Sequence, residues 1–294
     1  MREIINNLRE FLICLKSLSM SESIELDDKN NFCVATGVKS ESENWVFYDD
    51  ADISAAIINQ AKDFFDNKNL KFIWPVWRED LNLKFNNLNL LKPDGFMTGM
   101  YFDVKNFNAE LEREYYSGGE RLAERDGEIL NNLQQEINLD VNLNLKQERE
   151  DLNNNLKFKI LDFNSSKQEI DAWACTAWYG FDDGSNLDEK FLELARELVL
   201  NNKIRLVEAL LNNKSVGSVL LCEDDLNLGV YYFAVLPEFR RRGIAGLMMN
   251  KVLELACKLG KNKIVLQATQ EGEKFYKNFG FKYADRALIN LFVN

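Results

Sequence analysis

A strand, a basic glycine-containing turn and an amphipathic helix follow one another directly in residues 229–259. The strand GVYYFAV ends at Val235, and Pro237 stops its ladder because proline has no amide hydrogen to donate. The run RRRGIAG then leads into a helix with apolar side chains at helical spacing, which ends at Gly260. This unit predicts an α/β fold in which a strand and a crossover helix pack together in layers.

The turn has the chemistry of a phosphate site. Gly243 and Gly246 have no side chains and Ala245 is small, so a ligand can approach the backbone closely. The free N–H groups of the first helical turn and the helix dipole favour an anion there. A basic turn that only caps a helix is the alternative interpretation.

Two motifs carry a family resemblance. Arg240-x-x-Gly243-x-Ala245 matches the Q/R-x-x-G-x-G/A motif with which GNAT N-acetyltransferases bind the pyrophosphate of coenzyme A. The preceding LPEF resembles their lead-in, and LQATQEGEKFYKNFGF, which begins at Leu266, resembles their closing strand and helix. Because the two motifs occur in this order around a helix of suitable length, residues 156–294 resemble a GNAT acetyltransferase domain.

The resemblance implies a fold and a cofactor. The fold is a central splayed mixed sheet flanked by helices, and acetyl-CoA is the co-substrate, with its pantetheine between strands that end at Val235 and Thr269. An N–H near Val235 would stabilise the oxyanion of a direct transfer that needs no cysteine and no metal. The implied cofactor-binding residues are Phe233, Ala234, Val235, Arg240, Arg241, Arg242, Gly243, Ile244, Ala245, Gly246 and Thr269.

Tyr276 is the predicted catalytic residue. Its neighbours four residues away are Gly272 and Gly280, which leave that side of the helix uncrowded. A phenol keeps its proton at neutral pH and can donate it to the departing CoA thiolate. We therefore expect Tyr276 to be the general acid; a tyrosine that only packs against pantetheine is the alternative.

The general base is not evident in the sequence. The strands GVYYFAV and IVLQAT, where many relatives have a carboxylate, contain none. Glu208, Glu223 and Glu238 lie near strands and are the candidates, although each also fits a solvated surface position. A water molecule relayed to backbone carbonyls is a further alternative if the amine arrives neutral.

A chain of 294 residues exceeds the usual size of one domain, so a second one is expected. Residues 1–104 predict a smaller α/β domain, with a helix at 1–18, strands at 32–38, 45–48, 71–77 and 100–104, and a helix at 53–65. Residues 105–155 predict a charged, Asn-rich connector that is partly helical, and 156–294 the acetyltransferase domain.

Both halves end in a strand, a Gly-Phe pair and a further strand, which suggests a degenerate duplication; chance similarity between α/β elements is the alternative. Resemblance to tandem GNAT proteins implies that the first domain is a degenerate GNAT-like half that shapes the substrate cleft. Its turn before residue 53 carries Asp49, Asp50 and Asp52, which repel an anion. One active site per chain is expected.

Composition excludes several classes of function. The chain has no histidine, so histidine bases, Ser-His or Cys-His pairs and His-ligated zinc are excluded. A net charge of −11 argues against a non-specific nucleic-acid binder. The five scattered cysteines fit reduced, buried thiols. No signal peptide or membrane span is apparent, so we expect no membrane partner and a cytoplasmic location.

The predicted function is transfer of an acetyl group from acetyl-CoA to a primary amine of a small molecule or peptide. A non-catalytic acyl-CoA-binding protein is the alternative, favoured by the missing base. The sequence identifies neither the acceptor nor the oligomeric state. An aromatic cluster with adjacent acids consists of Trp173, Trp178, Tyr179, Phe181, Asp182 and Asp183. In one interpretation it borders the acceptor site, and in the other its members are core and loop residues.

Overall fold

The computed structural model describes residues 1–27, 31–50, 53–77, 91–105, 152, 155–181 and 186–293. Its strands are β1 (Glu22–Glu25), β2 (Phe32–Ala35), β3 (Asn44–Phe47), β4 (Ile73–Val76), β5 (Lys92–Asp103), β6 (Leu156–Leu161), β7 (Ile204–Leu211), β8 (Lys214–Glu223), β9 (Asn227–Val235), β10 (Lys263–Ala268) and β11 (Lys282–Val293). Its helices are α1 (Arg2–Lys16), α2 (Ala55–Asp66), α7 (Lys167–Gly180), α8 (Glu189–Leu198), α9 (Ile244–Lys258) and α10 (Gln270–Phe279), with short 3₁₀ turns η1 (Glu41–Glu43) and η2 (Pro237–Phe239).

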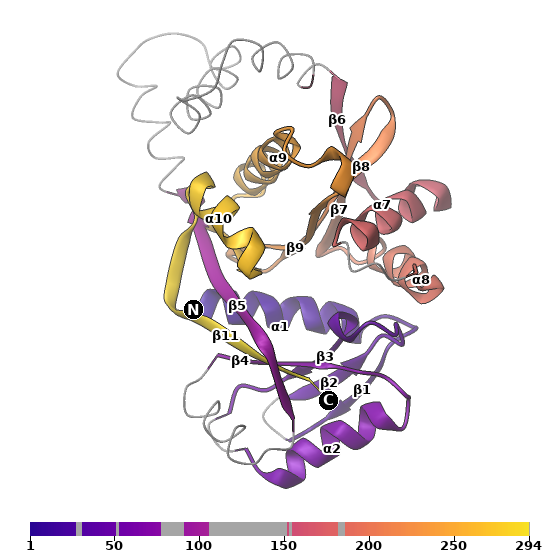
Figure 1. Cartoon of the computed structure of the whole chain (residues 1–294), viewed down its shortest axis with the longest axis vertical. Helices are drawn as coiled ribbons and strands as arrows, with labels where there is room; N and C mark the ends of the chain where they lie inside the picture. Colours follow the sequence, from indigo (N-terminus) through magenta and orange to yellow (C-terminus); the bar gives the residue numbers. More distant parts are fainter. Residues whose placement is uncertain are drawn as a thin grey trace.

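The strands form one mixed sheet in the order β1-β2-β3-β4-β11-β5-β10-β9-β8-β7-β6 (Figure 1). Each half contains a parallel pair joined through a helix: β3-α2-β4 in the first half and β9-α9-β10 in the second. The last strand of each half pairs with the other half, since β5 is antiparallel to β10 and β11 is antiparallel to β4. β5 and β11 also pair with each other at the centre.

This exchange of final strands joins the two halves into a single sheet. The predicted division of the chain at residues 104 and 155 remains a prediction. Each half is contiguous in sequence, but its final strand pairs with a strand of the other half. The strand predicted at 100–104 begins at Lys92, because β10 and β11 flank it on both sides.

Helices cover both faces of the sheet in its second half. Alternate residues of a strand point to opposite faces. Leu220 and Cys222 of β8 pack in a cluster with α1, α7 and α8, whereas Val219 and Leu221 pack with α9 and α10. In the described part of the chain, no helix combines the length and the apolar character needed to cross a bilayer.

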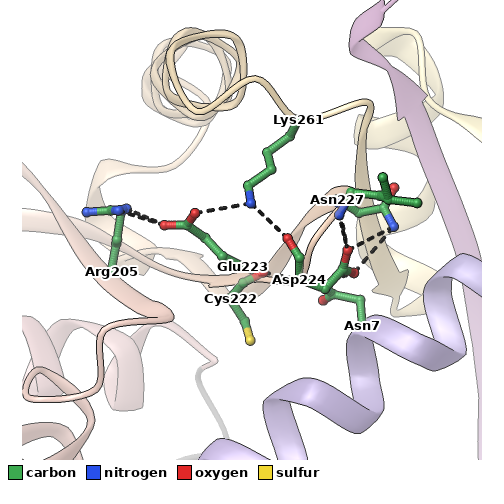
Figure 2. Close-up of polar contacts among 8 residues, drawn as sticks. Asn7, Arg205, Cys222, Glu223, Asp224, Asn227 and Lys261 are labelled. Carbon is green, nitrogen blue, oxygen red and sulfur yellow. Dashed lines mark hydrogen bonds and ion pairs between the residues drawn. The ribbon is translucent and has the colours of Figure 1, made fainter.

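Helix α1 is an N-terminal element that packs against the second half. A Cβ on Gly229 of β9 would lie 1.7 Å from Asn7 Oδ1, so only glycine permits this approach. Asn7 Nδ2 donates to the Cys222 carbonyl (3.2 Å) and to Asp224 Oδ2 (2.8 Å), as Figure 2 shows. The Tyr231 hydroxyl donates to Asn7 Oδ1 (2.9 Å). The first half is thus anchored beside the strand predicted to hold pantetheine.

The other helices and strands predicted for residues 1–104 occur in the structure, with different boundaries. The helix predicted at 53–65 begins at Ala55, because the Ser54 side chain caps it by accepting from Ile57 N (3.3 Å). The turn between β7 and β8 has positive φ at Asn212 and Asn213, as a tight hairpin requires. Strand β1 was not predicted, since its sequence ESIE is short and polar. The predicted connector lies outside the described residues except for 105, 152 and 155.

Candidate active site

Strands β9 and β10 separate toward their C-terminal ends. They pair at Asn227, Leu228 and Gly229 of β9, and the pairing ends there, although β9 continues to Val235 and β10 to Ala268. The splayed sheet implied by the resemblance is therefore confirmed. Side chains from both halves of the molecule line the gap.

A bulge in β9 directs the side chains at this gap. The register with β8 shifts between Ser218 and Leu220, so that β9 has one extra residue there. Tyr232 lies in the bulge with φ of 47°, a left-handed conformation that is uncommon for a bulky residue. As a result Tyr231 and Tyr232 both contact Phe11 of α1, while Phe233 stacks on Phe275 of α10.

The N–H of Val235 points into the gap. The Leu236 N–H donates to the Val216 carbonyl (3.0 Å) on β8, and Val235 is the next residue in the antiparallel register, opposite Gly217. Because backbone groups alternate in direction along a strand, Val235 directs its N–H and carbonyl away from β8. A contact between this N–H and an oxyanion remains a prediction.

The turn after β9 leaves open space over the start of α9. Gly243 caps the helix with φ of 90°, which favours glycine, and no side chain caps the helix. A Cβ on Gly243 or Gly246 would meet no protein atom within 4 Å. Ile244 is buried and Ala245 half-buried. The N–H groups of this turn are thus accessible to an anion.

The predicted arginines mainly hold the turn in shape. Arg240 Nε donates to the Val235 carbonyl (3.0 Å), and its Nη2 donates to the Gly180 carbonyl (2.6 Å) at the end of α7. Arg242 Nη2 donates to the Glu238 carbonyl (2.9 Å). Arg241 is exposed beside the turn. Cofactor contacts from these side chains remain a prediction.

A cavity of 250 Å³ occupies the gap. It brings together three predicted site residues, Phe233, Thr269 and Tyr276, whereas Ala234, Val235 and the turn residues are not part of its lining. The described lining residues are Phe11, Ser40, Ser42, Glu43, Trp45, Met97, Ala177, Trp178, Phe181, Phe191, Val230, Tyr231, Tyr232, Phe233, Gln267, Thr269, Gly272 and Tyr276.

Tyr276 lies in an aromatic environment in the cavity wall. Its ring centroid is 6.0 Å from that of Phe233 and 5.5 Å from that of Phe281. A Cβ on Gly272 would lie 3.2 Å from Tyr276 Cε2 and one on Gly280 would lie 3.3 Å from Phe102 Cε2, so aromatic rings pack closely against both glycines. Burial raises the pKa of the Tyr276 phenol, so the phenol keeps its proton.

Thr269 has a local structural task. Its side chain caps α10 by accepting from Gly272 N (3.3 Å). It also lines the cavity, so a contact with pantetheine is compatible with its position and remains a prediction.

Sequence reasoning missed Glu43, a buried carboxyl that lines the cavity from the first half. It accepts a hydrogen bond from the Tyr232 hydroxyl and another from Ser42 Oγ (3.3 Å). Burial raises its pKa to about 8, against the smaller opposing effect of these two hydrogen bonds. The polar run KSESE predicts a hairpin loop between the strands at 32–38 and 45–48, and no local pattern indicates that it lies against β9.

None of the candidate bases from the sequence is among the described lining residues. Glu208 is buried on β7, where burial raises its pKa. Glu223 forms ion pairs with Arg205 (2.7 Å) and Lys261 (3.2 Å), as Figure 2 shows. Glu238 is exposed on η2. These positions leave Glu43 as the carboxylate of the described cavity wall.

The aromatic cluster divides between the two interpretations. Trp178 and Phe181 line the cavity. Trp173 is a core residue whose Nε1 donates to the Val207 carbonyl (3.1 Å), and Tyr179 is exposed. Asp182 and Asp183 lie outside the described residues.

Comparisons with known proteins agree with this geometry. Residues 202–283 match the family model of the acetyltransferase (GNAT) domain. A GCN5-related N-acetyltransferase from Kribbella flavida is similar in fold, with a TM-score of 0.57 and 10% identity over 99% of this chain and 94% of that one. A conserved protein of unknown function from Staphylococcus epidermidis ATCC 12228 has a TM-score of 0.53 and 13% identity over 91% of this chain and 92% of that one.

The matched segment runs from just before β7 through β9, the open turn, α9, β10 and α10. It therefore includes the splayed strand pair, the glycine turn and Tyr276. Residues 202–283 therefore match a GNAT acetyltransferase domain, and the fold of the whole chain is similar to that of a GCN5-related N-acetyltransferase.

Proposed function

We propose that the protein transfers an acetyl group from acetyl-CoA to a primary amine of a small molecule or peptide. The observation that carries the proposal is the gap between β9 and β10, which has an open glycine turn at its edge and Tyr276 in its wall. A donor thioester and an amine can meet in such a gap from opposite faces of the sheet.

The cofactor is proposed to bind through backbone groups. Its pyrophosphate accepts hydrogen bonds from the free N–H groups of residues 243–246, where the α9 dipole adds attraction. Its pantetheine lies along Phe233, Ala234 and Val235, as an added strand would. The three arginines of the turn, Arg240, Arg241 and Arg242, make the approach electropositive in an otherwise acidic protein.

The transfer itself is proposed to be direct. The Val235 N–H polarises the thioester carbonyl and stabilises the tetrahedral oxyanion. Tyr276 donates its proton to the departing thiolate as the C–S bond breaks. No covalent enzyme intermediate is needed, which fits a cavity whose described wall contains no cysteine.

The test is release of free thiol from acetyl-CoA in the presence of amines. The protein should bind acetyl-CoA and release CoA only when an accepted amine is present. Tight binding of acetyl-CoA without thiol release for any of a broad set of apolar amines, amino acids, polyamines, aminoglycosides and lysine peptides would favour a non-catalytic acyl-CoA-binding protein.

A further inference from the structure

We infer that the N-terminal segment 40–45 completes the acceptor site, and that Glu43 binds the acceptor's ammonium group and acts as its general base. The acceptor is then a primary monoamine on a compact apolar body. This inference deepens the proposed function and rests on it.

The segment reaches the cavity because of how the two halves pack. The first half contributes Ser40, which precedes η1, Ser42 and Glu43 of η1, and Trp45 of β3. They line the cavity together with residues of β9 and α10 of the second half. Tyr232 joins the two, since its hydroxyl donates to Glu43 from the β9 bulge. The carboxyl is therefore held against β9, the strand that ends at Val235.

Glu43 has no cation beside it among the described residues. Its hydrogen-bond partners are the neutral hydroxyls of Tyr232 and Ser42. Among the described residues that line the cavity, Glu43 is the only one with an acidic or basic side chain. An unpaired carboxylate in a buried site is unfavourable. A bound ammonium group supplies the missing countercharge, so the site favours a cationic ligand that brings one positive charge.

The rest of the wall is aromatic. Rings of Phe11, Trp45, Trp178, Phe191 and Tyr232 line the cavity together with Glu43. Aromatic faces attract an ammonium group and also bury apolar surface. A second or third ammonium group would lose its hydration here without a second carboxylate on the described wall, which is costly. The wall therefore selects a monoamine over a polyamine or an aminoglycoside.

The volume points to a small acceptor. Sites for drug-sized ligands usually measure about 300–1,000 Å³. The cavity measures 250 Å³ and, on the proposed function, also receives the acetyl end of the cofactor. The remaining space fits one compact organic group, such as a phenyl or a branched alkyl chain.

The proton and bond changes balance. The ammonium gives one proton to the Glu43 carboxylate, and the freed nitrogen lone pair forms a bond to the thioester carbonyl carbon. The tetrahedral intermediate collapses, the C–S bond breaks, and the thiolate takes the Tyr276 proton. The nitrogen's second proton returns to the Tyr276 phenolate, and Glu43 releases its proton to water. The products are the amide, CoA thiol and one proton.

Binding can be tested separately from turnover. Because Glu43 has a pKa of about 8, it is mostly protonated in the empty site at pH 7, and an arriving ammonium group should ionise it. Calorimetry of 2-phenylethylamine in buffers of different ionisation enthalpy should give release of close to one proton per site. 2-Phenylethanol, which lacks the charge, should release none. Glu43→Gln should abolish proton release by the amine.

The second test is kinetic. We expect 2-phenylethylamine or isoamylamine to exceed spermidine, kanamycin and a lysine peptide in kcat/KM by at least ~10²-fold, and Glu43→Gln to lower kcat/KM by ~10²–10⁴-fold at pH 7 with unchanged acetyl-CoA affinity. Raising the pH toward 10 should partly restore the variant, because the amine is then neutral. Glu43→Asp should retain more activity than Glu43→Gln.

The matched control is Glu208→Gln, which removes a buried carboxyl that is not among the described lining residues. It should leave kcat/KM within ~2-fold of wild type, whereas a general effect of losing buried charge would lower both variants alike. If the enzyme prefers a polycationic amine, or if Glu43→Gln keeps full activity at pH 7, the inference about Glu43 is wrong. Thiol release in either case would still support the proposed function. Absence of thiol release with every amine overturns both.

Discussion

At the residue scale, two ionisable side chains of the cavity, Tyr276 and Glu43, have opposite tasks in the proposed reaction. Burial keeps the Tyr276 phenol protonated, as an acid requires, and it also disfavours the charged form of Glu43. Tyr276 could be predicted, since it lies four residues from two glycines within a short local motif. Glu43 could not, because its position depends on packing between segments 189 residues apart in the chain.

Tyr276→Phe removes the proton donor but keeps the ring that packs against Phe233 and Phe281. We expect kcat to fall by ~10²–10⁴-fold, with little change in acetyl-CoA affinity. Single-turnover measurements with an accepted amine check this under conditions where chemistry limits the rate. Tyr283→Phe is the control, because its exposed hydroxyl donates to Glu273 outside the described cavity wall. Wild-type kcat in Tyr276→Phe would make Tyr276 a packing residue.

Glu43 should also make stability depend on pH. Its pKa rises from 4.5 to about 8 on folding, so between these values the unfolded state loses the proton while the folded state keeps it. The contribution of Glu43 to the free energy of unfolding therefore falls as pH rises from about 4.5 to about 8. Glu43→Gln lacks this titration. Urea unfolding should show the variant gaining stability relative to wild type between pH 5 and pH 8; a pH-independent difference would contradict this.

At the scale of elements, the unit β9-α9-β10 was predicted well because its signals are local. Pro237 ends the strand ladder, Gly243 adopts a positive φ, and Gly260 follows the helix. The partners of β5 were not predicted, because a strand's sequence shows its alternation but not which distant edge it joins. The gap between β9 and β10 could be predicted from the family resemblance. The side chains that fill the gap could not be predicted, because they come from several elements that are distant in sequence.

Gly246→Leu tests the phosphate site at the start of α9. A Cβ at this position meets no protein atom within 4 Å, and leucine favours a helix more than glycine does, so the fold should remain intact. The added side chain would obstruct a pyrophosphate, and we expect acetyl-CoA affinity to fall at least ~10-fold, or about 1.4 kcal/mol. Calorimetry measures it.

The control is Gly260→Leu at the other end of the same helix. It also has open space around its Cβ but has φ of 64°, so a leucine there strains the backbone more than at Gly246. Acetyl-CoA affinity should nevertheless stay near wild type. Equal affinities for the two variants would show that the turn does not bind the cofactor.

At the scale of the whole molecule, the two halves share a strand-helix-strand arrangement but differ at the helix start. The N-terminus of α2 is capped by Ser54 and preceded by Asp49 and Asp50, whereas α9 has no side-chain cap and follows three arginines. A duplicated origin of the halves stays a prediction. We expect one acetyl-CoA per chain by calorimetric titration, and two equivalent sites would contradict the predicted asymmetry.

Because of the strand exchange, we expect the second half to depend on the first for folding. β5 pairs with β10 from Thr98 to Asp103 and lies between β10 and β11, and Phe102 packs its ring 5.6 Å from that of Phe281. A fragment of residues 152–294 would lack β5, so the edges of β10 and β11 that pair with it would be unpaired. The face of Phe281 that packs against Phe102 would be exposed. We expect it to aggregate or remain unfolded when produced alone, as gel filtration and circular dichroism would show.

Co-production with a separate polypeptide of residues 1–105 should restore a soluble complex, because that piece carries β5 and helix α1 with Asn7. The complex should bind acetyl-CoA with an affinity close to that of the intact chain, since the turn at Gly243 lies wholly in the second piece. Asn7→Leu in the first piece is the sharper variant: it removes the hydrogen bonds to Cys222 and Asp224 and should weaken assembly without touching the turn. A monomeric, folded 152–294 fragment that binds acetyl-CoA unaided would show that the GNAT domain folds independently, and that β5 is an addition to its sheet rather than a part of it.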